Sequence, residues 1–329
     1  MKKGHLIVGL LGAGLFIWVI AHMGRPAVAQ ELKAMRIALP IVVLLSLCRL
    51  LLQTTAWTLA LDDQNVSVQP GTLMGTRLAS QGMGYLTVLG PVLSEPMKIK
   101  LLHTAAEPTI TATFLDNGVY WFTSMLVAVF GWLCIPFVAA HGVHIGSVVL
   151  IVLGLTGILF FIAGRRAMLP VLVRKPGNRA PRWLTRAAMF ESSLRDYRRK
   201  RPSLVGRMFR IGIACQLLMA AEVVVVLWSL HLPMHFLAVF AIEGITRGLK
   251  LVSGWIPARL GSDEGGAISA FAMTGFSPVL GLTLAFTRRI RDLLWALIGL
   301  AWLVYKSPKL NDRQTAAVPA SGTFLGEAA

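Results

Sequence analysis

Charged side chains interrupt several stretches of the chain that are otherwise apolar, and they are the residues best suited to carry chemistry. A charge at bilayer depth costs about 2.5–3.5 kcal/mol, so such residues usually face a protein interior. The cations outnumber the acids near them, so a cavity that they line is stable when an anion enters it. Arginine binds phosphate oxygens through a bidentate fork, and we therefore expect a phosphate-binding site. Its candidate residues are Arg77, Lys98, Arg247, Lys250, Arg259, Arg288, Arg289 and Arg291.

Other polar residues in the same stretches have an expected structural role. Ser94 and Ser262 are predicted N-caps, each followed by acids in the first helical turn, where the helix dipole favours them. For Glu95 and Glu264, two roles fit the sequence equally well: a part in the site, or a structural role that only holds these helices in place. The expected capping and ion-pairing residues are Ser94, Glu95, Asp116, Ser262, Asp263, Glu264 and Asp292. For Arg288 and Arg289 the alternative to binding an anion is a side chain that extends toward the membrane surface.

The composition identifies the elements that position these residues as membrane helices. The chain has 329 residues, of which 55% are hydrophobic and only 14% are charged, and its mean hydropathy is +0.67. An ordinary soluble domain carries about 25% charged residues. These values exclude a soluble globular enzyme, a disordered protein and a disulfide scaffold, and they predict an all-α polytopic membrane protein.

Six apolar blocks are long enough to cross a bilayer, which requires about 20 residues each. We predict spanning helices over about residues 5–22, 37–61, 117–137, 146–163, 205–230 and 278–305. Two further stretches, at about 70–102 and 232–271, are apolar but broken by glycine, proline and charge. We expect them to form re-entrant helical hairpins, which require protein or water around their exposed backbone.

The basic segment between the fourth and fifth predicted spans determines the expected topology. Residues 165–210 contain fourteen Arg or Lys against two acids, which accounts for most of the net charge of +17. Basic loops stay on the cytoplasmic side, so both termini are expected in the cytoplasm of a bacterial inner membrane. We expect a first half at 1–163, a cytoplasmic loop at 164–204, a second half at 205–306 and a disordered tail at 307–329. The loop lacks the interleaved aromatic residues of a nucleic-acid-binding surface.

The two broken stretches resemble each other at an offset of about 170 residues. Thr76-Arg77, Gly84-Tyr85 and Leu89-Gly90 in the first stretch recur as Thr246-Arg247, Gly254-Trp255 and Leu260-Gly261 in the second. Because each half contains three predicted spans, the second half must be inverted relative to the first. Inverted halves with broken helices near the membrane midplane are typical of transporters that alternate access.

No motif for metal or cofactor chemistry accompanies these features. The three cysteines have no metal or redox spacing, and the two histidine pairs, near 141–144 and 231–235, lack a third ligand. The sequence also lacks a P-loop, a nucleophile elbow and a dinucleotide fingerprint. We therefore expect no metal, no cofactor and no enzymatic activity.

Two segments resemble the flippase-like family named after the transmembrane region of lysylphosphatidylglycerol synthase. They are Gly90-Pro91-Val92-Leu93-Ser94-Glu95-Pro96 and Trp255-Ile256-Pro257-Ala258-Arg259-Leu260-Gly261-Ser262-Asp263-Glu264. The second segment departs from the family at Ala258 and Arg259, where glycines are usual. The resemblance implies that the protein moves an anionic phospholipid, an aminoacyl-lipid or a polyprenyl-phosphate-linked lipid between leaflets.

Two classes of function remain open. The first is a lipid transporter whose partners are anionic membrane lipids, with transport either downhill or coupled to an ion. Glu222 and Asp292 are then candidate proton carriers. The alternative is a membrane scaffold that organises a neighbouring lipid-modifying enzyme through the basic loop. An intramembrane enzyme is less favoured, because the sequence offers no nucleophile–base pair.

Overall fold

The computed structural model describes residues 36–86, 90–102, 104, 106–138, 199–252 and 262–316. Within these ranges every regular element is a helix, and no strand is present, so the all-α prediction is confirmed there. The helices are α3 (Ala38–Asp63), α4 (Pro70–Leu86), α5 (Gly90–Leu102), α6 (Ala106–Val138), α10 (Pro202–Ser229), α11 (Phe236–Val252), α12 (Ser262–Met273) and α13 (Pro278–Ala316). The predicted spans at 5–22 and 146–163, and most of the basic loop, lie outside the described residues.

Proline and left-handed residues set several helix ends. α4, α10 and α13 begin at Pro70, Pro202 and Pro278, where the missing N–H of proline breaks no intrahelical hydrogen bond. α3 and α10 are followed by Asn65 and His231, whose φ angles are 56° and 54°. A residue in this left-handed conformation turns the chain out of the helix. These boundaries are therefore local properties of the sequence.

Three of the described helices are long and apolar enough to cross a membrane by length and composition: α3, α6 from Glu107 onward, and α10. They coincide with the predicted spans at 37–61, 117–137 and 205–230. α13 covers the predicted span at 278–305 but is not one of the three, because the charged cluster at 288–292 interrupts its apolar run. Large apolar side chains stay exposed on α3 and α6, such as Leu44 at 59% and Phe137 at 78%. Such surfaces indicate a membrane protein.

Two helix boundaries differ from the prediction. α6 begins at Ala106, well before the predicted start at 117. The polar side chains near this start have hydrogen-bond partners, so the helix can extend beyond the apolar run. There the Thr113 hydroxyl accepts a hydrogen bond from Nε1 of Trp57 at 3.2 Å, and the hydroxyls of Thr104 and Thr109 lie 2.7 Å apart. α13 continues to Ala316, into the predicted tail, since most residues after 308 are adequate helix formers.

The two broken stretches each contain a pair of helices. α4 and α5 occupy 70–102, and α11 and α12 occupy 236–273, close to the predicted 232–271. Within each pair the two helices pack against each other. α5 begins at Gly90, so Ser94 lies inside the helix and its prediction as an N-cap is wrong. The physical reason is that Pro91 fits the first turn of a helix and allows an earlier start. Ser262 is the first residue of α12.

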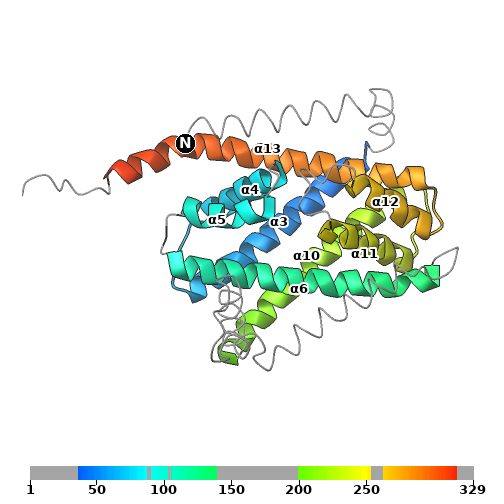
Figure 1. The fold of residues 1–329 in the computed structure, drawn as a ribbon, viewed down its shortest axis with the longest axis horizontal. Coiled ribbons are helices and arrows are strands. Elements are labelled where there is room, and N and C mark those ends of the chain that lie inside the picture. The colour runs from blue at the N-terminus through cyan, green and yellow to red at the C-terminus, as the bar shows by residue number, and fades with distance from the viewer. Residues whose placement is uncertain are drawn as a thin grey trace, which may run out of the picture.

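In each pair of short helices, one helix packs against a long helix from the other half of the chain. α4 contacts α13, α11 contacts α6, and α3 contacts α10. Gly82 and Gly75 of α4 lie against Ala296 and Trp302 of α13, so these two helices run antiparallel. In Figure 1, α6 and α13 run along opposite sides of the molecule, with α4 and α5 toward one end and α11 and α12 toward the other.

Glycines allow two of these helix pairs to approach closely. A Cβ on Gly131 of α6 would overlap the carbonyl oxygen of Phe240 of α11, and one on Gly299 of α13 would overlap that of Leu78 of α4. A large cluster of buried apolar side chains forms where α6, α10 and α11 meet. This packing fixes the positions of the polar residues that the same helices carry into the interior.

Candidate functional site

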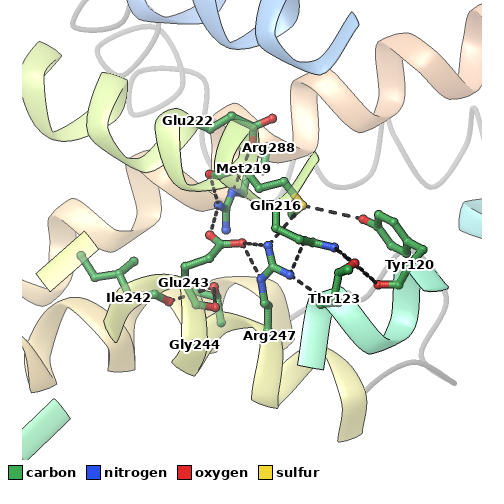
Figure 2. A network of polar contacts seen from close by, with 12 residues as sticks. Tyr120, Thr123, Gln216, Met219, Glu222, Ile242, Glu243, Gly244, Arg247 and Arg288 are labelled. Carbon is green, nitrogen blue, oxygen red and sulfur yellow. Dashed lines mark hydrogen bonds and ion pairs between the residues drawn. The ribbon is translucent and has the colours of Figure 1, made fainter. Parts of the chain in front are cut away.

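Glu243 of α11 binds two arginines in the second half of the chain (Figure 2). Its Oε1 accepts a hydrogen bond at 2.8 Å from Nε of Arg247, one turn along the same helix. Its Oε2 accepts another at 2.5 Å from Nη2 of Arg288 on α13. All three residues are buried, and Glu243 has no exposed surface. Both carboxylate oxygens are thus engaged, and Glu243 connects α11 with α13.

Glu222 of α10 extends this network on the far side of Arg288. Its Oε2 pairs with Nη1 of Arg291 and lies 3.6 Å from Nε of Arg288. Arg291 also donates to Oδ1 of Asp292 from Nε and Nη2, at 3.0 and 2.8 Å. Arg288 and Arg291 are three residues apart, which places them on one face of α13. Leaving either charge unpaired in the protein interior would cost about 3–5 kcal/mol, so the carboxylates stabilise the site.

Arg247 joins the network to α6 and α10. Its Nη1 donates to the Ser124 hydroxyl at 2.7 Å and to Oε1 of Gln216 at 2.5 Å. Nε2 of Gln216 in turn lies 3.5 Å from the Tyr120 carbonyl and 3.3 Å from the Thr123 hydroxyl. Figure 2 shows the Gln216 side chain between Arg247 and these α6 residues. A continuous run of polar contacts therefore extends from α6 through α10 and α11 to α13.

The first half contains a smaller buried cluster around Trp57 of α3. Nη2 of Arg77 on α4 donates to Oδ2 of Asp116 on α6 at 2.5 Å. Nζ of Lys98 on α5 donates to Oε1 of Glu95 at 2.9 Å. The Arg77 guanidinium and the Lys98 ammonium lie 5.2 and 5.9 Å from the centre of the Trp57 ring. Both distances fall within the range of a cation–π interaction, so one indole stabilises two cations.

Arg289 of α13 has more unpartnered donors than the other buried arginines of the described chain. Its Nη1 pairs with Oε1 of Glu264 on α12 at 2.6 Å. Its Nε and Nη2 are buried and form no hydrogen bond within the described ranges, and the residue is only 7% exposed. These two nitrogens form the edge of the guanidinium that binds two oxygens of a phosphate or carboxylate side by side. Arg289 therefore keeps hydrogen-bonding capacity beyond its ion pair with Glu264.

A small pocket lies beside Asp116, where α3, α6 and α10 meet. Its polar lining residues are Gln53, Asp116 and Tyr120, and its remaining lining is formed by Ala56, Val119, Met208, Ile211, Gly212 and Cys215. Gln53 and Asp116 are only 6% and 5% exposed. The pocket thus has room for about one water molecule, beside a buried carboxylate that already contacts Arg77.

Most of the predicted site residues lie in these clusters. Arg77 and Lys98 belong to the first, and Arg247, Arg288 and Arg291 to the second. Arg289 pairs separately with Glu264, and Lys250 lies half-buried on α11. Of the predicted ion-pairing residues, those that contact a cation are Glu95, Asp116, Glu264 and Asp292. Asp263 lies in the first turn of α12, and Arg259 lies outside the described residues.

Ion pairs neutralise several of the predicted cations. In the part of the chain that the structure describes, the buried ion pairs join six of them to six carboxylates. One of these carboxylates, Glu243, is not among the predicted site residues, and it occupies the centre of the network. Glu222 is predicted only as a candidate proton carrier. The spacing of four between Glu243 and Arg247 is the signal that could have identified it, because it places both on one helix face.

Comparison with known proteins adds no further constraint. No family model matches the chain, and no curated protein or solved structure matches it either. The resemblance to the flippase-like family therefore stays a resemblance of sequence segments, which are those at 90–96 and 255–264 together with the final helix at 288–300. Among the described residues, no group of three or more His, Cys, Asp or Glu side chains could hold a metal ion.

Proposed function

We propose that the protein is an integral membrane lipid transporter that moves an anionic lipid between the leaflets of the inner membrane. The observation that carries this proposal is the open edge of Arg289. Its Nε and Nη2 are buried without a hydrogen-bond partner in the described part of the chain, and Glu264 already balances its charge at 2.6 Å. A phosphodiester carries one negative charge on two free oxygens, which match that edge in spacing and charge.

Arg77 supplies a second cation with unused hydrogen-bonding capacity, in the first half of the chain. Its Nε is buried and has no partner among the described residues, whereas its Nη2 contacts Asp116. A head group that passes between the two halves would therefore meet an arginine with a free donor in each. Lysine would be a poorer choice at both places, because an ammonium group lacks the planar fork.

The reciprocal packing of short and long helices supports an inverted-repeat architecture. The contact of α4 with α13 has its counterpart in the contact of α11 with α6, and α3 packs against α10. Two halves related by a pseudo-twofold axis would produce this pattern. We infer six spanning helices with α4–α5 and α11–α12 as re-entrant hairpins, and both termini in the cytoplasm. The buried ion pairs would then lie at membrane depth, where isolated charges are costly.

The substrate class follows from the chemistry of the phosphate. The head group would enter the protein interior as an anion, while the acyl or polyprenyl chains stay in the bilayer. Anionic phospholipids, aminoacyl-lipids and polyprenyl-phosphate-linked lipids share this phosphate. The sequence has no P-loop, so we infer transport that is downhill or coupled to an ion.

Vesicles reconstituted with the full chain test the proposal. Fluorescent phosphatidylglycerol in the outer leaflet, bleached by a membrane-impermeant reductant, reports the exchange of lipid between leaflets. We expect exchange to be faster than in protein-free vesicles. We expect Arg289→Lys to slow it about tenfold, because loss of one bidentate contact costs about 1.4 kcal/mol or more.

Arg207→Lys is the matched control, because Arg207 is exposed on α10 and is not part of either cluster. Its exchange rate should equal that of the unmodified protein. The proposal fails if exchange is no faster than in protein-free vesicles for phosphatidylglycerol, lysyl-phosphatidylglycerol and a polyprenyl phosphate alike. Equal rates in Arg289→Lys and Arg207→Lys would remove Arg289 from the binding site.

A further inference from the structure

Arg49 is the only cation of α3, and it lies near the middle of that helix. The other charged residues of α3, Asp62 and Asp63, lie at its end. Eleven residues of the helix precede Arg49 and fourteen follow it, so at about 1.5 Å per residue it is about 17 Å from the start and about 21 Å from the end. α3 is long and apolar enough to cross a membrane. Because the hydrocarbon core is about 30 Å thick, a spanning α3 places Arg49 near the bilayer centre.

The Arg49 side chain has no anionic partner in the described part of the chain. Its Nε is buried and has no hydrogen-bond partner, and the ion pairs among the described residues do not include it. The residue is half-buried. Its stem of three methylene groups is much shorter than the distance to either end of α3, so the charge does not reach a membrane surface by extending along the helix.

The helices around α3 offer no carboxylate that is still available to Arg49. Those that pack most closely against it are α4, α6, α10 and α13, and α4 contains no acid. The acids that the other three contribute to the buried clusters already pair with other arginines; they are Asp116, Glu222 and Asp292. The predicted spans at 5–22 and 146–163 contain no Asp or Glu. Arg49 therefore lacks a counter-charge of its own.

The neighbours of Arg49 along α3 place it between the two buried clusters. Ser46, one turn earlier, accepts a hydrogen bond at 2.8 Å from Nε1 of Trp295, which follows the arginine cluster of α13 by one turn. Gln53, one turn later, lines the small pocket beside Asp116. Residues three or four positions apart lie on one face of a helix. Arg49 is thus positioned between the arginines of α13 and the ion pair of Asp116.

Arg77 lies in the same region as Arg49. Both arginines and Asp116 act electrostatically on the Cys215 thiol, which contacts the Arg49 carbonyl at 3.8 Å. Among the described residues, two arginines therefore face one carboxylate here, and Arg77 already donates to its Oδ2. Nε of Arg77 is buried without a hydrogen-bond partner, as is Nε of Arg49. Both guanidinium groups thus keep a donor for an oxygen of a ligand.

We propose that Arg49 binds the phosphate of the transported lipid in the middle of the bilayer. This inference rests on the proposed function and adds to it a binding residue between the two clusters. An arginine without a counter-charge is costly at this depth, and so is a phosphate. The ion pair of Lys98 with Glu95 nearby is neutral and does not change this. Because the guanidinium presents a planar fork of donors to two oxygens, each charge stabilises the other.

Thermal unfolding in an uncharged detergent tests the binding without transport. Phosphatidylglycerol should raise the unfolding midpoint of the full chain, because a ligand that binds only the folded state stabilises it. Arg49→Gln loses no ion pair, so its midpoint without lipid should equal or exceed that of the unmodified protein. Its apparent Kd for phosphatidylglycerol, taken from the dependence of the midpoint on lipid concentration, should rise about tenfold, as expected for the loss of one charge-assisted hydrogen bond.

Two further ligands and one variant serve as controls. Phosphatidylcholine and inorganic phosphate at the same concentrations should raise the midpoint less than phosphatidylglycerol does. An equal rise with inorganic phosphate would assign the site to free phosphate and overturn the inference. Arg207→Gln removes the same charge from an exposed position on α10, and it should keep the unmodified Kd. An equal loss of affinity in Arg207→Gln would reduce the effect to general surface electrostatics and overturn the inference as well.

The exposed thiol beside Arg49 reports its depth in the membrane. Cys48 is exposed, whereas Cys134 and Cys215 are buried, so a nitroxide reagent labels Cys48 selectively. In reconstituted vesicles the label should be more accessible to oxygen than to a polar nickel complex, as expected near the bilayer centre. A label at the level of the head groups would remove the need for a counter-charge and overturn the inference.

Lipid exchange in the same vesicles connects the binding to transport. Arg49→Gln should slow the exchange of fluorescent phosphatidylglycerol about tenfold, whereas Arg207→Gln should not change it. Unchanged affinity and unchanged exchange in Arg49→Gln overturn the inference and leave the proposed function intact. Weaker binding with unchanged exchange indicates a lipid that is held but not transported, which also overturns it. Exchange no faster than in protein-free vesicles removes the proposed function, and the midpoints then still decide whether Arg49 binds lipid.

Discussion

Gly131 of α6 and Gly244 of α11 pack backbone against backbone, so that a Cβ added to Gly244 would lie 2.9 Å from the Cα of Gly131. Beside them, Nε1 of Trp132 donates a hydrogen bond to the Gly244 carbonyl at 2.7 Å. Gly244 directly follows Glu243, the carboxylate at the centre of the arginine network. Close packing of two helices therefore determines where that carboxylate lies.

We expect Gly131→Ala to lower the free energy of unfolding by about 1–3 kcal/mol, the usual cost of overpacking a core. The new methyl group would overlap the Phe240 carbonyl. A backbone carbonyl in a helix cannot change its position by rotation, as a flexible side chain can. α11 must therefore move away from α6. Thermal unfolding of the purified protein in detergent, followed by circular dichroism, measures the effect.

Gly206→Ala is the control for this substitution. No atom lies within 4 Å of a Cβ built at Gly206 on α10, and alanine is the better helix former by about 1 kcal/mol. Its unfolding midpoint should equal or exceed that of the unmodified protein. A midpoint for Gly131→Ala as high as that of Gly206→Ala would contradict the close contact of α6 with α11.

Glu243→Gln should destabilise the fold by about 3–5 kcal/mol, the range observed when one partner of a buried ion pair is removed. The substitution keeps the size of the side chain but leaves Arg247 and Arg288 sharing less negative charge. Chemical denaturation in detergent, followed by tryptophan fluorescence, measures the loss.

A double-mutant cycle separates this charge effect from packing. In Glu243→Gln/Arg247→Gln the second substitution removes one of the two uncompensated cations. We expect the loss of unfolding free energy in the double variant to be smaller than the sum of the two single losses by about 0.5–3 kcal/mol. Strictly additive effects would show that the two side chains do not interact.

Trp57→Phe should be milder than Trp57→Leu. Phenylalanine keeps an aromatic face for Arg77 and Lys98 and loses the hydrogen bond from Nε1 to Thr113. Leucine loses both, and the further loss should be about 0.5–2 kcal/mol in the free energy of unfolding. Trp121→Leu is the control, since Trp121 is 58% exposed. Equal stability of Trp57→Phe and Trp57→Leu would argue against a cation–π contribution.

The ion pair between Asp63 and Arg201 should contribute little by comparison. Arg201 is 64% exposed and its Nε lies 3.4 Å from Oδ1 of Asp63, so water and salt screen the attraction. We expect Asp63→Asn to change the free energy of unfolding by less than about 1 kcal/mol. Unfolding midpoints at low and high salt measure this, and a loss as large as that of Glu243→Gln would contradict it.

Several helices and their breaks are predictable because they depend on local signals. The apolar runs of α3 and α10, and the prolines that begin α4 and α13, are visible without tertiary structure. The true start of α6 at Ala106 lies outside the apolar run, because its first turns contain polar threonines. Gly90-Pro91 allows α5 to begin before Ser94.

The partners of the buried charges could not be predicted in the same way. Arg288 contacts Glu243 across 45 positions of sequence and Glu222 across an even longer separation, and only the packing of α10, α11 and α13 brings them together. The cations themselves were identified because charge in an apolar run is conspicuous. Their neutralisation depends on which helices are neighbours, which no local pattern specifies.

The packing of α4 and α11 against long helices of the opposite half has a mechanical consequence. Because α4 is packed on α13 and α11 on α6, a tilt of either long helix would also displace a short helix that belongs to the other half of the chain. The backbone contacts between these helices therefore couple the two halves mechanically.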